Sequence, residues 1–181
     1  IVGAFMQLNP FDEPDVAATK AATRQLLDGE GTAGSGTPLT PQDLGASLAS
    51  AGQGAYLAIL TYLPDEPALF DVLEEFAKAV REHFDLPVTL NPGPRYLHST
   101  GQLHKGGNPH GLFLFVRSVP ERDLDIFDED FGFAHLNHAQ AEGDRAVLID
   151  RGRAVCSVEL VGPTMSCVAQ LRGALAPILS A

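Results

Sequence analysis

The sequence has few cysteines and few basic residues, and both shortages exclude classes of protein. Only two cysteines occur in 181 residues, Cys156 and Cys167, and their spacing does not match a metal site, so we expect buried free thiols in a cytoplasmic protein. Lysine and arginine number 12 against 23 acidic residues, a net charge of −11. A chain of this charge is expected to repel nucleic acid and anionic lipid surfaces.

Long hydrophobic runs are also missing. The longest apolar stretches, such as 57–60 and 112–116, are far shorter than the roughly 20 residues that a membrane-spanning helix needs. The opening residues IVGAFMQL have no basic region or cleavage site of a signal peptide. Because they resemble the interior of a strand, we expect this chain to be a fragment of a longer polypeptide.

The residues that are present predict three consecutive parts. Residues 1–28 are expected to form a strand over 2–8 and then a helix from Pro14 to Leu27. Residues 29–54 begin with GEGTAGSGTP, which is typical of a linker and resembles a phosphate-binding loop only in composition. They end in a short helix that starts at Thr40-Pro41. Residues 55–181 are expected to form the main α/β domain.

Apolar strand patterns alternate with helical patterns in this third part. Strands are expected over 55–63, 87–90, 111–119 and 154–161. Helices are expected over 67–84, over 131–152 with a break near Gly143, and from Pro163 onward. Buried strands separated by helices favour a three-layer αβα sandwich with a mostly parallel, Rossmann-like sheet. No internal repeat is found.

Ligands of such sheets bind beyond the carboxyl ends of the strands. The segments NPFDEP (9–14) and 91–107, and the loop after Val116, each follow an apolar strand pattern. We therefore expect them to lie at the same edge of the sheet and to form one site.

These two segments also carry a resemblance to a known family. FDEPDVAATK (11–20) resembles the lysine-bearing signature of glucose-6-phosphate isomerases, and RYLHSTGQLHKGG (95–107) resembles the segment that carries their catalytic histidine. LNHAQAEGDRAVLIDRGRAVCSVEL (136–160) resembles the C-terminal isomerase region of transaldolase/glucose-6-phosphate isomerase fusions. The resemblance implies a sugar-isomerase fold and a site shared within a homodimer.

The same resemblance implies the roles of individual residues. Glu82 would be the base that moves a proton between C2 and C1 through an enediol. His98 would assist ring opening, and Lys20 would support it or stabilise oxyanion charge. Ser99, Thr100 and Gln102 would bind the sugar phosphate.

Isomerisation by this route needs no cofactor. The serine/threonine-rich phosphate-binding segment of the family is missing, so the remaining N-terminal portion of the polypeptide is an expected partner.

Other interpretations of these residues remain open. Glutamates near helix ends are commonly solvated, and serine or threonine before a helix commonly caps it. His98, His104 and His110 recur every six residues, which is neither helical nor strand spacing, so a zinc site is not expected. A non-catalytic sugar-phosphate-binding module and a dimerisation domain are the alternatives to an isomerase.

Overall fold

The computed structural model describes residues 1–9, 11–29 and 36–181. The expected glycine-rich linker lies largely outside the described residues, because its residues 30–35 are not among them. The strands are β1 (Tyr56–Tyr62), β2 (Val88–Pro92), β3 (Gly111–Val119) and β4 (Ala154–Val161). The α-helices are α1 (Val2–Phe5), α2 (Pro14–Leu27), α3 (Pro41–Ala49), α4 (Pro67–Phe84), α5 (Gly101–Gly106), α6 (Phe133–Asp150) and α7 (Thr164–Leu175). Two 3₁₀ helices complete the set, η1 (Arg95–His98) and η2 (Ala176–Ser180).

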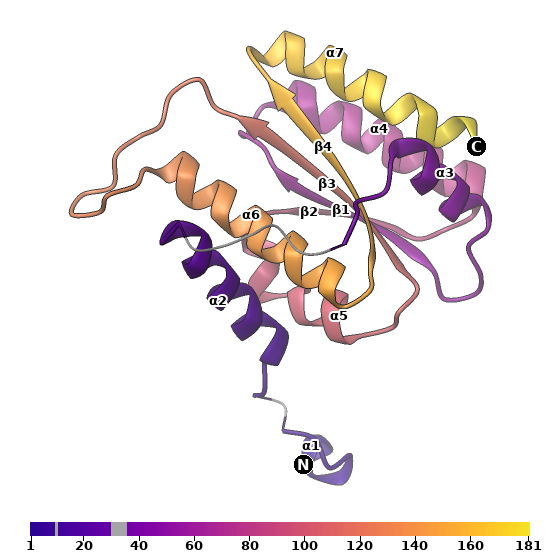
Figure 1. Ribbon diagram of the computed structural model, residues 1–181. Coiled ribbons are helices and arrows are strands. Elements are labelled where there is room, and N and C mark those ends of the chain that lie inside the picture. Colours follow the sequence, from indigo (N-terminus) through magenta and orange to yellow (C-terminus); the bar gives the residue numbers. More distant parts are fainter. Residues whose placement is uncertain (10, 30–35) are drawn as a thin grey trace.

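The strands form one parallel sheet in the order β2-β1-β3-β4. Helices α3, α4 and α7 lie on one face, and α6, α5 and α2 lie on the other (Figure 1). The expected three-layer α/β fold with a Rossmann-like parallel sheet is confirmed. Parallel strands need crossovers, which contain α4, α5 and α6, and the remaining helices complete the cover of the two faces.

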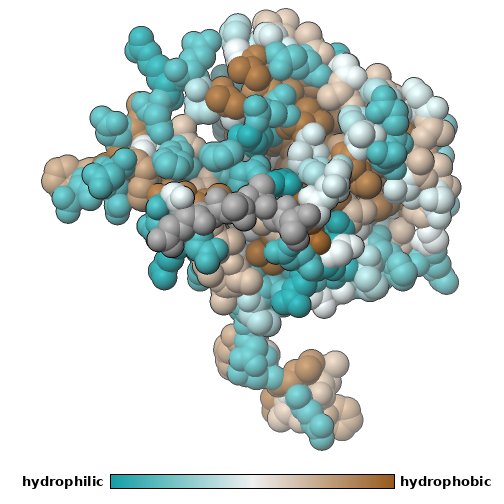
Figure 2. Space-filling model, in the orientation of Figure 1, coloured by the Kyte–Doolittle hydropathy of each residue, from teal (hydrophilic) through white to brown (hydrophobic). Residues whose placement is uncertain are grey.

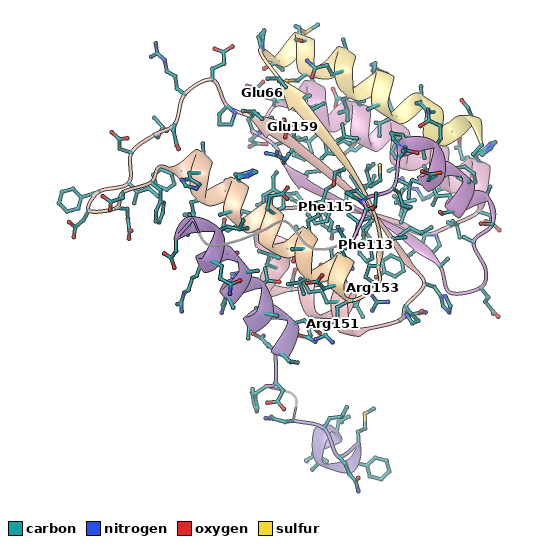
Figure 3. All side chains as sticks on the ribbon, viewed as in Figure 1. Glu66, Phe113, Phe115, Arg151, Arg153 and Glu159 are labelled. Atoms are coloured by element: carbon teal, nitrogen blue, oxygen red, sulfur yellow. The ribbon has the colours of Figure 1, made fainter. Side chains whose placement is uncertain are left out.

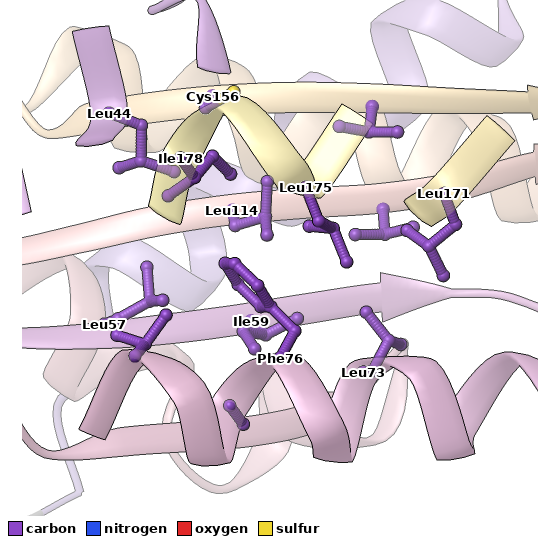
Figure 4. Close-up of a cluster of buried hydrophobic side chains, with 14 of the residues drawn as sticks. Leu44, Leu57, Ile59, Leu73, Phe76, Leu114, Cys156, Leu171, Leu175 and Ile178 are labelled. Carbon is purple, nitrogen blue, oxygen red and sulfur yellow. The ribbon is translucent and has the colours of Figure 1, made fainter. Parts of the chain in front are cut away.

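The larger hydrophobic core lies under α3, α4 and α7. Strand residues such as Leu57, Ile59 and Leu114 point into it, and Leu73 and Phe76 of α4 meet them (Figure 4). In α4 the apolar residues recur at helical spacing, so a single side of the helix is buried. The opposite face of the sheet has a smaller apolar cluster that includes three aromatic rings of the strands, Tyr62, Phe113 and Phe115.

Two expected elements differ from the structure. The expected strand over 2–8 was wrong: residues Val2–Phe5 form a short helix without a buried residue, and it extends away from the body (Figures 1 and 2). This segment has no described strand beside it, and an isolated strand has no partner for its backbone hydrogen bonds.

The expected break near Gly143 was also wrong, because α6 continues through it to Asp150. A Cβ atom at position 143 would lie 2.7 Å from Thr23 Oγ1 and 3.3 Å from the Thr19 carbonyl oxygen of α2. Gly143 therefore permits the close approach of α2 to α6, and it does not end the helix.

Within the described part of the chain, no helix has the combined length and hydrophobicity that crossing a membrane requires.

Candidate functional site

The segment 93–107 forms the crossover from β2 to β3. It folds as η1 followed by α5, and it buries Tyr96, Leu97, His104 and Lys105 against the sheet and α6. His98 is exposed between these buried residues. The glycines and the short helices let the chain turn twice within a few residues, which one long helix would not allow.

A buried ion pair holds this segment in place. Lys105 Nζ contacts Asp144 Oδ1 of α6, and the two side chains are only 1% and 0% exposed. The Tyr96 hydroxyl donates to Asp144 Oδ2 at 2.5 Å and lies 3.3 Å from the Tyr62 hydroxyl. Burial, together with the Asp144 carboxylate, raises the pKa of Tyr96 well above its usual value. Tyr96 therefore remains a hydrogen-bond donor at neutral pH.

His104 lies beside this pair, on the same side of α5. Its Nδ1 is 3.2 Å from the Tyr56 hydroxyl, whereas its buried Nε2 has no hydrogen-bond partner among the described residues. Burial first, and then the charges of Lys105 and Arg153, lower the pKa of His104 to about 4. His104 is thus a neutral, structural histidine at physiological pH.

Arg153, at the start of β4, fixes the end of α5. Its guanidinium donates to the backbone carbonyls of Lys105 at 2.7 Å, Gly107 at 2.9 Å and Asn108 at 3.1 Å. The last carbonyls of a helix have no intrahelical donor, and this arginine supplies one. The segment is therefore fastened to both α6 and β4.

The expected substrate-binding residues have different environments. Gln102 Nε2 donates to Asp15 Oδ2 at 2.6 Å, and the Asp15 amide donates to Gln102 Oε1 at 3.1 Å. The Ser99 hydroxyl donates to the Tyr96 carbonyl at 3.2 Å. Thr100 is the N-cap residue of α5 but makes no side-chain cap, and its buried Oγ1 has no partner among the described residues. Gln102 is thus committed to a contact within the protein.

The contact between Gln102 and Asp15 brings the two motif segments together, though not where the sequence predicted. Asp15 also pairs with Arg151 at 2.6 Å, which lies just before the start of β4. The segments therefore meet toward the amino ends of the strands, where Figure 3 places Arg151 and Arg153. The expectation that NPFDEP follows a strand at the carboxyl edge was wrong, because α1 precedes it.

The three expected catalytic residues do not converge within one chain. Glu82 is in the last turn of α4, on the opposite face of the sheet from α5; its side chain is 67% exposed and lies 3.8 Å from Lys78. His98 is exposed at the end of η1, and Lys20 is exposed on α2. A site that uses all three would have to include more than this single chain.

The structure has a cavity of about 870 Å³ at the carboxyl ends of β1, β3 and β4. The connection after β1 leads to α4 on one face, and the connection after β3 leads to α6 on the other. Chains that diverge in this way leave a crevice where α/β proteins commonly bind ligands. Among the described residues, the lining includes neither Lys20, Glu82 and His98 nor the expected substrate-binding residues.

Charged side chains form a network along the wall of this cavity. Arg117, at the end of β3, pairs with Glu159 of β4 and donates from Nη1 to His138 Nδ1 at 2.8 Å. Its Nε lies 3.9 Å from Glu142, which in turn binds Arg145 at 2.7 Å. The positive charge of Arg117 is therefore already compensated by two carboxylates.

This network fixes the form of His138. Partial burial, and then the nearby Arg117 charge, lower the pKa of His138. An arginine has no acceptor atom, so Nδ1 of the neutral imidazole accepts the hydrogen bond and Nε2 carries the proton. His138 lines the cavity as a hydrogen-bond donor.

Asp123 closes the same region at the start of α6. Its carboxylate accepts from the amides of Ala134 at 2.6 Å, His135 at 3.1 Å and Leu124 at 2.8 Å. The hydrogen bond from Ala134 is the chief cause of the lowered pKa of Asp123. The N-terminus of a helix favours anions, and here the Asp123 carboxylate occupies that position.

Sequence reasoning missed the residues that organise both regions. Asp144 lies shortly before the apolar run 146–149 of α6, and Arg117 follows the apolar run of β3. A charge in such a setting is a usable signal, because buried charges require partners.

Metal-binding clusters are not found in the described ranges. Among residues 1–9, 11–29 and 36–181, no group of three or more histidine, cysteine, aspartate or glutamate residues could hold a metal ion.

Comparison with known proteins adds information on the fold. No family model matches this sequence, and no curated protein matches it. Among solved structures, the hypothetical protein TT0462 from Thermus thermophilus superposes with a TM-score of 0.51 at 16% sequence identity. The match covers 77% of this chain and 44% of the other, so the chain spans less than half the length of that protein. At this identity the similarity supports the shared α/β fold alone.

Proposed function

We propose that this chain is part of an aldose–ketose isomerase that interconverts glucose 6-phosphate and fructose 6-phosphate, as its resemblance implies. The observation that carries the proposal is the presentation of His98. The buried residues Tyr96 and Lys105, on either side of it, are both held by Asp144, whereas His98 itself is exposed. The backbone around His98 is thus held in place while its imidazole remains accessible to a ligand, and a held backbone supports the preorganisation that a catalytic group needs.

The proposed role of His98 is ring opening. Its imidazolium would donate a proton to the ring oxygen as the bond between C1 and that oxygen breaks and the C1 hydroxyl releases its proton to water, giving the open-chain aldose. A base would then take the C2 proton while O1 gains a proton, which forms the enediol. Return of a proton to C1, with loss of the proton on O2, would give the ketose. No metal or cofactor is required, because each step is a proton transfer.

The other proposed catalytic groups would act across a boundary. Glu82 is exposed on the far face of the sheet, and Lys20 is exposed on α2. Glu82 as the base and Lys20 as the oxyanion-stabilising group therefore require either a homodimer or the remaining N-terminal portion of the polypeptide. That portion would also supply the residues that bind the substrate phosphate.

A non-catalytic sugar-phosphate-binding or dimerisation module is the second candidate. It is favoured by Glu82, which pairs with its helix neighbour Lys78 and not with a residue near His98. An i,i+4 pair of this type is common on solvated helices. The two candidates differ in whether removing the Glu82 carboxylate changes turnover.

The test measures isomerisation by the full polypeptide that contains this chain. His98→Ala should slow turnover of the cyclic substrate more than that of the open-chain form, and Glu82→Gln should slow both by on the order of 10²- to 10⁴-fold. His110→Ala, another exposed histidine, is the matched control and should be silent. Turnover within about twofold of wild type in both variants would reject Glu82 as the base and His98 as the ring-opening group. Absence of isomerisation by the wild-type polypeptide would reject the isomerase. Retained sugar-phosphate binding in that case would support the binding module.

A cytoplasmic location is proposed together with this function. Cys156 and Cys167 are both buried free thiols, as expected for a reducing compartment. Burial raises the pKa of Cys156 to about 11, which keeps that thiol protonated and unreactive.

A further inference from the structure

We propose that the cavity at the carboxyl ends of β1, β3 and β4 is a separate binding site for a neutral, polyhydroxylated small molecule, such as a polyol or an open-chain sugar without a phosphate. This site is independent of the one proposed around His98. It lies at the other end of the sheet from the contact between Asp15 and Gln102, beside Glu159 (Figure 3).

The first argument is position and size. The cavity occupies the crevice where the connections after β1 and β3 diverge to opposite faces. Its volume of about 870 Å³ lies within the range of small-molecule sites, roughly 300–1,000 Å³. Tyr62 and Leu69 contribute apolar surface to its lining, as is usual in such sites.

The second argument is electrostatic and disfavours an anion. Asp123 occupies the amides at the start of α6 that would otherwise receive a phosphate. The guanidinium of Arg117 is paired with Glu159 and lies near Glu142. A phosphate dianion entering here would meet the carboxylates of Glu121 and Asp123 and would find the Arg117 cation already paired. Arg122 is the other arginine of the lining, and it would have to offset both the repulsion and the cost of desolvation.

The third argument concerns the hydrogen-bond donors and acceptors of the residues that line the cavity. Neutral His138 presents an Nε2 donor whose tautomer is fixed by Arg117. The side chains of Ser118, Asn137 and Thr164 also line the cavity and can each donate and accept. Hydroxyl groups need both functions from their surroundings. The lining therefore matches a ligand with several hydroxyls better than one with a charged group.

The experiment is a titration followed by amide chemical shifts, with glucitol as the neutral probe and inorganic phosphate as the anionic probe. Glucitol should give saturable, millimolar binding, with the shifts concentrated at Ser118, Asn137 and Thr164. Phosphate should leave these signals unchanged. Absence of saturable shifts with glucitol, or equal shifts with phosphate, would overturn the proposal.

Variants tie the binding to the cavity. His138→Leu removes the fixed donor and should weaken glucitol binding about tenfold, whereas His110→Leu, outside the cavity, should not. Ser118→Trp should abolish binding by filling the space, and it keeps the test valid if His138→Leu fails to fold. Unchanged binding in Ser118→Trp would place the probe elsewhere and reject the site.

Two further variants test the electrostatic argument and the independence of the two sites. Asp123→Ala frees the amides of Ala134 and His135, so it should gain binding of inorganic phosphate; if it gains none, the electrostatic reason for a neutral ligand is wrong. His98→Ala should leave glucitol binding unchanged. Loss of binding in His98→Ala would instead merge the two sites and reject their independence.

Discussion

The two faces of the sheet are covered by helices of different chemistry. Under α3, α4 and α7 the buried cluster is made almost wholly of aliphatic side chains with Phe76. Under α5 and α6 the apolar cluster is smaller and lies beside the buried pair of Lys105 and Asp144. The Tyr96 hydroxyl donates to Asp144, and the Tyr62 hydroxyl pairs with that of Tyr96. Both faces exclude water, but by different means.

The difference indicates what each face does. Aliphatic packing is non-directional, so a helix such as α4 is placed mainly by shape and by the amount of surface that it buries. A buried ion pair gives little net stability, because desolvation offsets the attraction, yet it strongly disfavours any arrangement that separates its members. The polar face therefore fixes the position of the segment 93–107, which carries His98.

The largest expected effect comes from breaking the buried pair. Asp144→Ala leaves the Lys105 ammonium and the Tyr96 hydroxyl without their acceptor, so it should lower the free energy of unfolding by about 3–5 kcal/mol. The double variant Asp144→Leu with Lys105→Met removes both charges and should recover most of this loss. Urea unfolding at pH 7 measures both. Equal instability of the single and double variants would mean that the pair is not the cause.

The apolar face should respond to the loss of volume alone. Leu73 is fully buried in the cluster under α4, and Leu73→Ala should cost about 3 kcal/mol in the free energy of unfolding. The exposed neighbour Glu74 is the control, and Glu74→Ala should change stability by no more than about 0.5 kcal/mol. The same urea titrations apply. A cost for Leu73→Ala below about 1 kcal/mol would show that this face repacks easily.

A smaller effect should come from the contact between α2 and α6. Gly143→Ala would place a methyl group 2.7 Å from Thr23 Oγ1 and 3.0 Å from its backbone nitrogen, at a cost of about 1–3 kcal/mol. Gly173 is a helical glycine of α7, and a Cβ atom at that position would have nothing within 4 Å. Gly173→Ala should therefore stabilise the protein by about 0.5 kcal/mol. Thermal unfolding of both variants is the measurement, and a neutral Gly143→Ala would contradict the close approach.

The smallest effect should be a dependence on pH that arises from the polar face. The pKa of His104 is lowered to about 4, whereas the unfolded chain should titrate near the ordinary value of about 6.5. Between these values the unfolded state binds more protons, so stability falls as the pH decreases from about 6.5 toward 4.

The comparison is wild type against His104→Phe between about pH 6.5 and 5, where most carboxylates remain ionised. Wild type should lose about 1 kcal/mol more of its unfolding free energy than the variant over this interval. Parallel pH profiles would show that His104 is not the group responsible.

The elements that the sequence predicted well are those whose pattern is local. The strand over 154–161 and the helix over 67–84 have the predicted bounds, because their apolar residues repeat with the period of the element itself. The short helix α1 was mistaken for a strand, since an apolar run of that length fits either structure. Gly143 was mistaken for a helix break because its reason is the close approach of another helix.

The candidate sites were less predictable, since they depend on long-range placement. His98 stays a prediction from its segment, and the partner of that segment, Asp144, lies in another helix and has no motif of its own. The cavity network joins Arg117, His138 and Glu159 from β3, α6 and β4. These residues are far apart in the sequence and come together only because the crossovers place their elements side by side. Such long-range pairs produce no repeating sequence pattern from which they could be predicted.

The attachment of the segment 93–107 also has a consequence for its motions. Short irregular segments commonly fray and exchange their amide hydrogens quickly. Here Asp144 holds Lys105 from one side and Arg153 binds the carbonyls at the end of α5 from the other. The amide of His104, which donates to the Thr100 carbonyl at 2.9 Å, should therefore exchange as slowly as the amides of β3, because opening it requires unfolding the layer to which it is fastened.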